Sequence, residues 1–309
     1  MIAYNPAAGR YPSRLLVERA AHVFEVQGWN VQLEQTLGSE HITHLARQAA
    51  QRNFDYFFIA GGDGSVNRAV AGLVDSQTAL GVLPAGTANV WAQELGLPGL
   101  TWTRLSALEE SARRLAGGRV QLIDIGYCND QPFLMWAGVG LDGIIIHHIE
   151  PRRRWEKHFA VVQYAASAVW HAAFWHGMNL RVEADGQQVR GHFLLSLVSN
   201  VHLYAGGIAE LTPKACLNDG TMDLWLFEGE TLGDVAQLAW ELWAGSHTTS
   251  NRVRQIPFHR LRIESDTPTY VQLDGEPADG GSCVTISVHA RSLRVLVPET
   301  TPRELFREP

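Results

Sequence analysis

The stretch "FDYFFIAGGDGSVNRAVAGL", residues 54–73, places three glycines and one aspartate between two different apolar patterns. The run 54–60 has the length and aromatic content of a buried strand, whereas the apolar residues 66, 69, 70 and 73 recur at helical spacing. Gly61, Gly62 and Gly64 can take positive φ and carry no Cβ, so backbone N–H groups can point at an anion beside the helix N-terminus. The following residues form neither a Gly-Lys-Ser/Thr loop nor a G-x-G-x-x-G turn. The stretch predicts a phosphate-binding loop, with an ordinary tight turn as the alternative.

Two further loops combine small residues in the same way after an apolar run. In "ALGVLPAGTANVWAQELGLP" we expect a strand to end at Leu83, a turn at Gly86 and a helix from about Thr87, whose hydroxyl can cap the helix or bind a ligand. "NPAAGR", residues 5–10, follows the opening strand "MIAY". Loops that follow parallel strands lie at the carboxyl edge of an open α/β sheet, where ligands bind. The three loops therefore predict one shared site.

The elements that must position these loops alternate between strand and helix as far as about Asp124. Such alternation predicts a parallel sheet with helices on both faces. The expected strands are near residues 1–4, 30–35, 54–60 and 79–84, and the expected helices near residues 13–27, 42–51 and 63–73.

The second half of the chain has a different pattern, dominated by strands. "QLIDIGYCNDQPFLMWAGVG" predicts two strands around an Asn-Asp turn, and "MNLRVEADGQQVRGHFLLSLVSN" predicts a hairpin around Asp185-Gly186. Further strands are expected in "GTMDLWLF", "RLRIES", "TYVQLDG", "CVTISVHA" and "LRVLVPE". Apolar helices are expected near residues 155–176 and 232–246. This change of pattern predicts a domain boundary near Asp124.

Composition limits the possible functions. The 309 residues are 46% hydrophobic and 18% charged, which is typical of a folded protein, and the net charge of −7 argues against nucleic-acid binding by general basicity. Cys128, Cys216 and Cys283 are too far apart to predict a disulfide framework or a zinc site. No signal peptide is recognisable, and polar residues interrupt the uncharged segment 159–180, so we expect a cytoplasmic protein without a membrane span.

The motifs "NPAAGR", "GGDGSVN", "LPAGTANVWA", "LNDGTMDL" and "LDGEP", in this order, resemble the diacylglycerol kinase catalytic family, which includes bacterial lipid kinases and is related to sphingoid-base kinases. The resemblance implies an α/β N-terminal nucleotide domain like that of NAD kinases and phosphofructokinases, followed by a β-rich, sandwich-like domain. We expect the first at residues 1–124, with 292–309 returning to it, and the second at 125–291. The implied activity is transfer of the γ-phosphate of ATP to a lipid hydroxyl, with a diacylglycerol-like acceptor.

The same resemblance assigns site residues. Glu276 is the expected proton acceptor, while Asp274 and Asp63 are alternatives that the sequence does not separate from it. Asp63 is also expected beside the triphosphate, where it can hold Mg²⁺ or order the surrounding hydrogen bonds; capping of its own helix is the alternative. The residues expected around the nucleotide are Asn5, Gly9, Arg10, Thr36, Gly61, Gly62, Asp63, Gly64, Ser65, Val66, Asn67, Gly86 and Thr87.

A structural Mg²⁺ site is implied in "KACLNDGTMDL". It would comprise the side chain of Asp219 and the backbone carbonyls of Cys216 and Thr221, because Mg²⁺ prefers oxygen ligands. An Asn-Asp-Gly hairpin turn is the alternative interpretation of this segment.

Four positions depart from the family pattern: Ser65 is a mild change that keeps a hydroxyl, Ala8 stands where the family has a serine, Arg68 reverses a charge and Val90 removes a carboxylate. The last two motivate an alternative function, a lipid- or nucleotide-binding relative with impaired catalysis. A small-molecule kinase resembling NAD kinases is a further alternative. The basic run 152–154, followed by an aromatic, almost uncharged segment, predicts contact with an anionic membrane surface, with an exposed basic loop that caps a core helix as the alternative. The acceptor lipid and the oligomeric state do not follow from the sequence.

Overall fold

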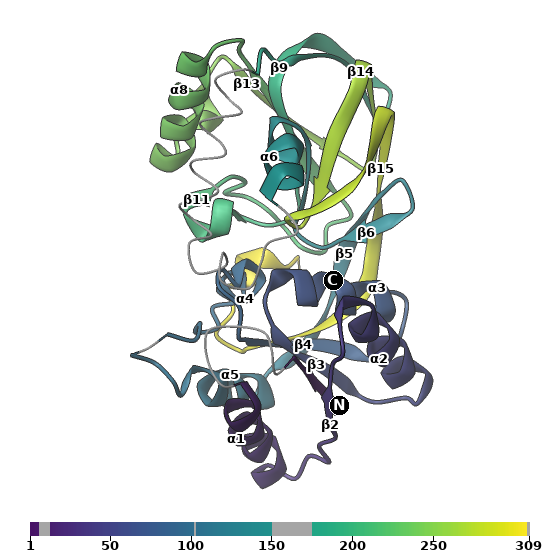
Figure 1. Cartoon of the computed structure of the whole chain (residues 1–309), viewed down its shortest axis with the longest axis vertical. Helices are drawn as coiled ribbons and strands as arrows, with labels where there is room; N and C mark the ends of the chain where they lie inside the picture. The colour runs from purple at the N-terminus through teal and green to yellow at the C-terminus, as the bar shows by residue number, and fades with distance from the viewer. Residues whose placement is uncertain (6–12, 102, 150–174, 308–309) are drawn as a thin grey trace. The chain divides into compact units, whose positions relative to one another are not determined.

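A parallel sheet organises the N-terminal part of the chain in a computed structural model, which describes residues 1–5, 13–101, 103–149 and 175–307 (Figure 1). Its strands are β1 (Ile2–Tyr4), β2 (Leu33–Gln35), β3 (Tyr56–Gly61) and β4 (Ala79–Pro84). They lie in the order β2-β1-β3-β4, and each neighbouring pair is parallel. The predicted α/β fold class of this part is confirmed.

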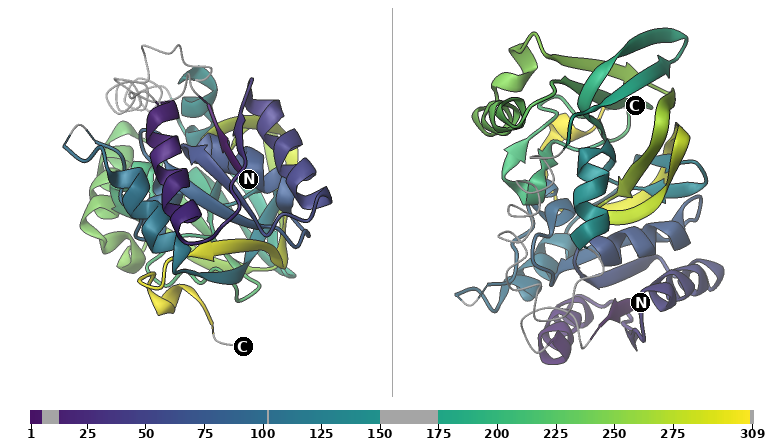
Figure 2. Two further views of the ribbon diagram at one scale, coloured as in Figure 1. Left: turned by 90° about the horizontal axis from the view of Figure 1, so that it is seen from below. Right: turned by 45° about the horizontal axis from the view of Figure 1, so that its top comes forward.

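The helices of this part cover both faces of the sheet. They are α1 (Ser13–Val26), α2 (Ser39–Gln51), α3 (Asp63–Leu73), α4 (Val90–Glu94) and α5 (Ala107–Ala116). The two views of Figure 2 place α1 with α5 on one face and α2 with α3 on the other, and the members of each pair contact one another. The buried side chains of α3 recur every three or four residues, as expected for a helix that packs one face on a sheet: Val66, Ala69, Val70 and Leu73.

The second part of the chain is built from antiparallel strands. Its elements begin with β6 (Gln131–Phe133), β7 (Trp136–Gly140), α6 (Leu141–Ile149), β8 (Met178–Ala184) and β9 (Gln187–Ser199). They continue with β10 (Leu203–Tyr204), η2 (Ala205–Gly207), β11 (Ala209–Glu210), β12 (Met222–Glu228), α8 (Leu232–Ala244), η3 (Ser246–Thr249), β13 (Val253–Phe258) and β14 (Arg260–Leu273).

The long strands of this part change partners along their length. Strand β14 pairs with β8 in its first half and with β7 in its second half, and β9 does the same. Alternate side chains of these strands point into one apolar core, which includes Phe133, Phe193 and Phe258. The expected β-rich, sandwich-like domain is thereby confirmed.

The chain forms two compact units, and two strands pass from one to the other. Unit 1 comprises residues 1–125, 217–219 and 290–309, and unit 2 comprises residues 126–216 and 220–289. Strand β5 (Arg119–Cys128) leaves unit 1, and β15 (Glu276–Val297) returns to it, where Val295 pairs in parallel with Leu80 of β4. The short helix η4 (Arg303–Leu305) follows.

Several local expectations were wrong. The helix after β4 begins at Val90 and not at Thr87, because Asn89 takes a left-handed conformation (φ 54°) that interrupts the helical path. The segments "RLRIES" and "TYVQLDG" form one strand, β14, and "CVTISVHA" and "LRVLVPE" form another, β15. Helices α5 and α6 had not been expected. The helix expected at 155–176 lies outside the described residues, apart from Trp175 and His176, which are not helical.

Candidate functional site

The carboxyl ends of the four parallel strands lie at one edge of the sheet of unit 1. Asn5 follows β1, Thr36 follows β2, Gly62 follows β3 and Gly86 lies two residues after β4. The strand order reverses between β1 and β3, which is the position where open α/β sheets bind ligands. Gly9 and Arg10, which were also expected here, lie outside the described residues.

Thr36 carries an unsatisfied polar atom at this edge. Its backbone N–H donates to the carbonyl of Tyr4 at 2.8 Å, which extends the pairing of β1 and β2 by one residue. The side chain is 3% exposed, and its Oγ1 has no hydrogen-bond partner within the described part of the chain. A buried hydroxyl without a partner is costly and calls for an explanation, such as a ligand that completes it.

The loops after β3 and β4 touch through their glycines. A Cβ on Gly86 would lie 2.4 Å from the Cα of Gly62, and a Cβ on Gly62 would lie 3.2 Å from the Cα of Gly86. Neither residue has a positive φ, so of the two properties of glycine noted in the sequence only the missing Cβ matters at these positions. These two positions favour glycine because two backbones approach each other closely, and the result is a continuous surface of main chain ahead of α3.

Asp63 joins the same two loops. It is the first residue of α3, but its side chain does not cap that helix. Instead, Oδ1 accepts a hydrogen bond from the backbone N–H of Trp91, in the first turn of α4, at 3.1 Å. Burial raises the pKa of the Asp63 carboxyl above its ordinary value, although hydrogen bonds from the N–H groups of Val90 and Trp91 act in the opposite direction.

Asn89 holds the shape of the loop after β4, and no role had been assigned to it from the sequence. Its Oδ1 accepts from the N–H of Gly86 at 2.8 Å, and its Nδ2 donates to the carbonyl of Gly86 at 3.0 Å. Thr87, which had been expected at the start of the helix, is exposed and lies within this bonded turn, before the first residue of α4. Asparagine is among the few residues that adopt the left-handed conformation at low cost, which is the signal that could have identified Asn89.

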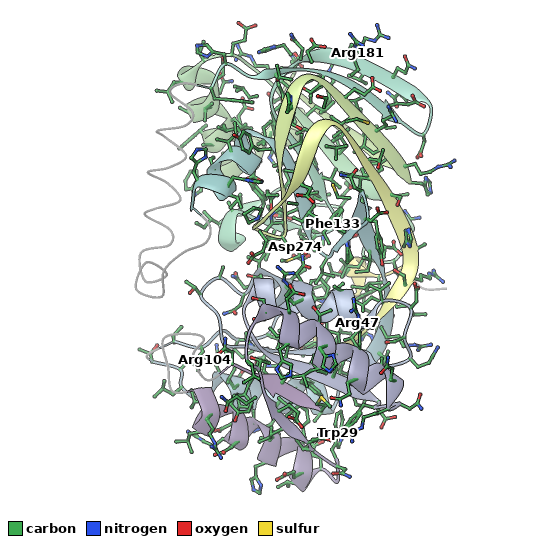
Figure 3. All side chains as sticks on the ribbon, turned by 45° about the vertical axis from the view of Figure 1, so that its right-hand side comes forward. Trp29, Arg47, Arg104, Phe133, Arg181 and Asp274 are labelled. Atoms are coloured by element: carbon green, nitrogen blue, oxygen red, sulfur yellow. The ribbon has the colours of Figure 1, made fainter. Side chains whose placement is uncertain are left out.

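The second group of candidate residues lies in unit 2, at the turn between β14 and β15. Asp274 and Gly275 have φ of 50° and 83° and form the two-residue loop of a hairpin in which Leu273 pairs with Glu276. Asp274, which is labelled in Figure 3, is buried, with an exposed fraction of 4%. Its carboxylate accepts hydrogen bonds from three consecutive backbone N–H groups, those of Leu134 (2.7 Å), Met135 (2.8 Å) and Trp136 (3.0 Å).

Those three bonds give Asp274 a structural role. They fix the segment between β6 and β7 to the hairpin turn, and the N–H of Asp274 in turn donates to the carbonyl of Trp136 at 2.9 Å. Glu276, at the start of β15, is only partly buried. The two carboxylates that the sequence could not separate therefore differ in their surroundings.

A buried glutamine is hydrogen-bonded to the turn between β14 and β15. Gln272 is 1% exposed; its Oε1 accepts from the N–H of Gly275 at 2.8 Å, and its Nε2 donates to Oδ2 of Asp142 at 2.7 Å. Asp142 belongs to the first turn of α6 and is also buried. Sequence reasoning missed both residues, although a glutamine flanked by Val271 and Leu273 in a buried strand is an unusual residue for that position.

The segment "LNDG" is tied to the C-terminal part of unit 1. Asn218 accepts from the N–H of Arg307 at 2.7 Å and donates to its carbonyl at 3.0 Å. A guanidinium nitrogen of Arg307 lies 3.2 Å from a carboxylate oxygen of Asp219. The Asp219 carboxylate therefore already faces one cation, and its expected role as a Mg²⁺ ligand stays a prediction.

No group of three histidine, cysteine, aspartate or glutamate side chains is placed to hold a metal ion among the described residues. The family resemblance implies that Cys216 and Thr221 contribute backbone carbonyls to such a site, and for Cys216 the reason is that a thiol is too soft a ligand for Mg²⁺. Magnesium at this turn therefore stays a prediction from the sequence.

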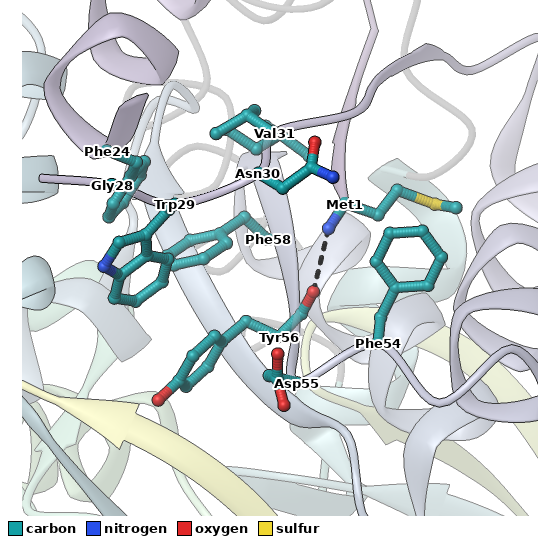
Figure 4. Close-up of a pocket in the computed structure, with 11 residues that line it drawn as sticks. Met1, Phe24, Gly28, Trp29, Asn30, Val31, Phe54, Asp55, Tyr56 and Phe58 are labelled. Atoms are coloured by element: carbon teal, nitrogen blue, oxygen red, sulfur yellow. Dashed lines mark hydrogen bonds between the residues drawn. The ribbon is translucent and has the colours of Figure 1, made fainter. Parts of the chain in front are cut away.

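A cavity of about 470 Å³ lies elsewhere in unit 1 (Figure 4). It is lined by aromatic rings, of which Trp29 and Tyr56 stack with their centroids 4.6 Å apart. Ile2 and Tyr56 begin strands β1 and β3, so the cavity lies at the amino ends of the strands. It is therefore at the opposite edge of the sheet from the glycine loops and is not part of the candidate site.

Comparison with known families accounts for both units. The sequence profile of the diacylglycerol kinase catalytic domain matches residues 1–128, and that of the YegS C-terminal NAD kinase beta sandwich-like domain matches residues 137–297. The chain belongs to the diacylglycerol kinase catalytic family. The resemblance inferred from the loop motifs is thereby confirmed, and the N-terminal part is a kinase catalytic domain of this family.

Relatives of this family match along most of their length. A diacylglycerol kinase of Bacillus subtilis (strain 168) is 28% identical over 277 residues, which cover 89% of this chain and 88% of the relative. A diacylglycerol kinase of Staphylococcus aureus (strain MRSA252) is 26% identical, with 89% and 85% covered.

Solved structures show the same fold. The crystal structure of a diacylglycerol kinase from Bacillus anthracis str. Sterne matches with a TM-score of 0.74 at 20% identity and covers 97% of each chain. An NAD kinase from Archaeoglobus fulgidus, solved in complex with ATP, matches with a TM-score of 0.54 at 13% identity over 99% of this chain and 97% of the other. The expected similarity of the N-terminal fold to NAD kinases is confirmed.

The two strongest departures from the pattern of the diacylglycerol kinase family have local explanations. The guanidinium of Arg68 forms an ion pair with Glu40 of α2, with an N–O distance of 2.9 Å, so its charge is partly neutralised. Val90 is 2% exposed and packs in the core at the start of α4, where Asp63 supplies the carboxylate that bonds to the helix N-terminus. The bonds that hold the glycine loops, from Trp91 to Asp63 and between Asn89 and Gly86, are present alongside Arg68 and Val90.

Proposed function

We propose that the protein is a kinase that transfers the γ-phosphate of ATP to the hydroxyl of a diacylglycerol-like lipid. The observation that carries this proposal is the backbone contact of Gly62 and Gly86 at the carboxyl edge of the sheet, next to Asp63. Main-chain surfaces at the N-terminus of a helix bind phosphate groups, because N–H groups can approach the oxygens without an intervening side chain. The names of the relatives support the kind of acceptor.

The nucleotide is proposed to bind along this edge. Asn5 and the hydroxyl of Thr36 are expected to bond to it, and the unsatisfied Oγ1 of Thr36 supports this role. Asp63 is proposed to act as a positioning residue, because its bond to Trp91 keeps the loops after β3 and β4 together. The remaining proposed contacts are with Gly9, Arg10, Gly61, Gly62, Gly64, Ser65, Val66, Asn67, Gly86 and Thr87.

In the proposed reaction the lipid hydroxyl oxygen forms a bond to the γ-phosphorus, and the bond from that phosphorus to the bridging oxygen breaks. ADP leaves with the bridging oxygen, and the hydroxyl proton passes to the carboxylate of Glu276. Asp274 is a weaker candidate for the base, since three N–H groups already bond to its oxygens. Mg²⁺ enters as part of the substrate, MgATP, and reduces the charge of the phosphates. No step depends on Asp219.

Two alternatives differ from this proposal in their products. A relative with impaired catalysis would bind ATP or lipid and transfer no phosphate, and a small-molecule kinase would phosphorylate a soluble acceptor such as NAD⁺. The ion pair of Arg68 with Glu40 and the burial of Val90 weaken the first alternative, because both explain the sequence changes that motivated it.

Incubation with γ-labelled ATP, magnesium and a total lipid extract tests the proposal, with NAD⁺ in a parallel reaction. We expect label in a chloroform-soluble product that comigrates with phosphatidic acid when purified diacylglycerol replaces the extract. Label only in a water-soluble product would contradict a lipid acceptor. Nucleotide binding without any labelled product would favour the impaired relative. The proposed location is the cytoplasmic side of the membrane, where ATP and a bilayer lipid are both accessible.

A further inference from the structure

Helix α8 of unit 2, labelled in Figure 1, carries an arc of exposed apolar residues. Trp240 and Trp243 are each 63% exposed, and their ring centroids lie 5.1 Å apart. Leu232 is 46% exposed, and Ala236 and Ala239 are exposed as well. At 3.6 residues per turn these five residues lie within one arc of the helix. Contiguous apolar surface of this kind marks a site of interaction.

The opposite face fixes the helix to its own unit. Leu238 and Leu242 are buried. At the N-terminus the Thr231 hydroxyl accepts from the N–H of Asp234 at 3.2 Å, and the Asp234 carboxylate accepts from the N–H of Thr231 at 3.0 Å, which together form a capping box. Arg252 forms an ion pair with Asp234. The two tryptophans are therefore held out by a well-anchored helix.

The exposed arc carries no charge. Asp234 and Glu241 are the charged residues of α8, and both lie outside the arc. Asp234 is engaged by Arg252, and a carboxylate oxygen of Glu241 accepts from the Nε2 of Gln237 at 2.7 Å. A strongly charged partner would find no complementary group on this face.

The size of the face excludes a stable contact with a second copy through α8 alone. A helix of 13 residues is roughly 20 Å long, and an arc about 10 Å wide offers on the order of 200 Å². A stable protein interface needs about 800 Å² from each partner. A bilayer sets no such minimum, because a few aromatic side chains are enough for reversible attachment.

We propose that the exposed face of α8 lies in the interfacial layer of a lipid bilayer, with Trp240 and Trp243 at the level of the headgroups. The indole ring combines an apolar surface with one N–H donor, and tryptophan concentrates at this depth in membrane proteins for that reason. The choice of a bilayer as partner rests on the proposed function, since a diacylglycerol-like acceptor resides there. Among the described residues no helix is long and apolar enough to cross the membrane.

This attachment differs from the one predicted from Arg152, Arg153 and Arg154, which lie outside the described residues. Contact through α8 depends on burial of apolar surface, so it should occur on uncharged lipid and persist in high salt. Contact through arginines should require anionic lipid and weaken as salt is added.

Flotation of the full chain with vesicles of pure phosphatidylcholine, at low salt and at 0.5 M NaCl, tests the proposal. We expect the wild type to bind at both salt concentrations. The affinity of the double variant Trp240→Ala/Trp243→Ala for the vesicles should be lower by roughly tenfold or more. Brominated phosphatidylcholine should quench part of the wild-type tryptophan fluorescence, and this part should be missing from the double variant. Alanine preserves the helix, and a thermal melt checks that the variant is folded.

Gln237→Ala on the same helix and Val26→Ala, an exposed apolar residue of unit 1, are matched controls that should bind like the wild type. Equal binding of the double variant and the wild type would overturn the proposal. Absence of wild-type binding to phosphatidylcholine vesicles would overturn it as well. A wild-type dimer that the double variant dissociates, measured by sedimentation, would overturn it in favour of a second copy.

Activity on detergent-dispersed diacylglycerol separates this proposal from the proposed function. The double variant should phosphorylate dispersed lipid like the wild type, because α8 carries none of the candidate catalytic residues. If neither protein phosphorylates any lipid but the tryptophans still direct vesicle binding, the proposed function fails and the surface assignment stands. If both are active and vesicle binding does not depend on the tryptophans, only the surface assignment fails.

Discussion

The backbone N–H of Trp91 donates to the carboxylate of Asp63 at 3.1 Å, which joins the loops after β3 and β4. The bond does not fully offset the burial of the carboxyl, whose pKa is raised. The folded state therefore disfavours the ionised form of Asp63 relative to the unfolded chain. Protonated Asp63 therefore adds to the stability of the folded protein. This contribution is complete below the pKa of Asp63 in the unfolded chain and is lost as the pH rises through its higher pKa in the folded protein.

Asp63→Asn should accordingly be more stable than the wild type at pH 7, and the difference should shrink as the pH falls toward 4. Relief of about 1 kcal/mol would raise the melting temperature by roughly 2–4 °C. Differential scanning calorimetry between pH 4 and pH 8 measures the effect. Asp130→Asn, at an exposed turn, is the control. A variant that is less stable than the wild type at pH 7 would show that the bond to Trp91 needs the full charge.

Substitution of the touching glycines should be graded according to the space at each position. Gly86→Ala places a Cβ 2.4 Å from the Cα of Gly62, whereas Gly62→Ala places one 3.2 Å from the Cα of Gly86. We expect Gly86→Ala to abolish ATP binding and to cost about 1–3 kcal/mol of stability, as overpacking does, and Gly62→Ala to weaken both less. Isothermal titration with MgATP and urea unfolding provide the two readings.

Gly117→Ala is the control for this series, because a Cβ there would meet nothing within 4 Å. Normal ATP affinity in a folded Gly86→Ala protein would mean that the close approach serves only the fold. Gly62→Val, which adds a β-branched side chain, should lose nucleotide binding before it loses the fold.

The sequence predicted the parallel sheet, because a strand such as 54–60 and a helix such as 63–73 have different hydrophobic periods. It also predicted the hairpin at Asp185-Gly186, where both residues have positive φ (49° and 89°). The start of α4 was misplaced because the helix signal at Thr87 competes with the left-handed conformation of Asn89, which depends on its bonds to Gly86.

The site could be predicted in part. Each glycine loop is a continuous stretch of sequence that follows a strand, and the topology of a parallel sheet is enough to place such loops at the same edge. Bonds between distant segments could not be inferred. The bond from the N–H of Trp91 to Asp63 spans 28 positions, and the bond from the N–H of Leu134 to Asp274 spans 140, so no local sequence pattern predicts them. The sequence for the same reason left Asp274 and Glu276 equivalent.

Asp274 and Glu276 should respond differently to amide substitution. Asp274→Asn puts an NH₂ group against backbone donors, so at least one of the three N–H groups loses its acceptor; we expect a loss of about 1–3 kcal/mol in stability. Glu276→Gln keeps the shape but cannot take a proton, so kcat should fall by roughly 10²–10⁴ with nearly normal ATP binding and stability. Urea unfolding and steady-state kinetics on dispersed diacylglycerol test both variants.

The opposite pattern would reverse the assignment of the base. A stable Asp274→Asn protein that has lost turnover, beside an active Glu276→Gln protein, would identify Asp274 as the proton acceptor. Loss of turnover in Glu276→Gln together with loss of ATP affinity would instead place Glu276 in nucleotide binding.

Gln272 is expected to position Glu276 through the turn between them. Its Oε1 accepts from the N–H of Gly275, the residue next to Glu276, and its Nε2 donates to the buried Asp142. Gln272→Met has nearly the same length but makes neither bond, which should cost about 1.5–3 kcal/mol because one partner is a carboxylate. We expect kcat to fall while the KM for ATP stays unchanged, since none of these residues belongs to the glycine loops.

Gln188→Met, at an exposed position of β9, is the matched control and should behave like the wild type. Steady-state kinetics below the melting temperature of the variant separate the two effects of Gln272→Met. A variant that is less stable but has normal kcat would show that Gln272 supports only the fold. A lower kcat at a temperature where the variant is fully folded would show that the orientation of Glu276 depends on the bond from Gly275, because the other side-chain bond of Gln272 goes to Asp142 and not to the turn.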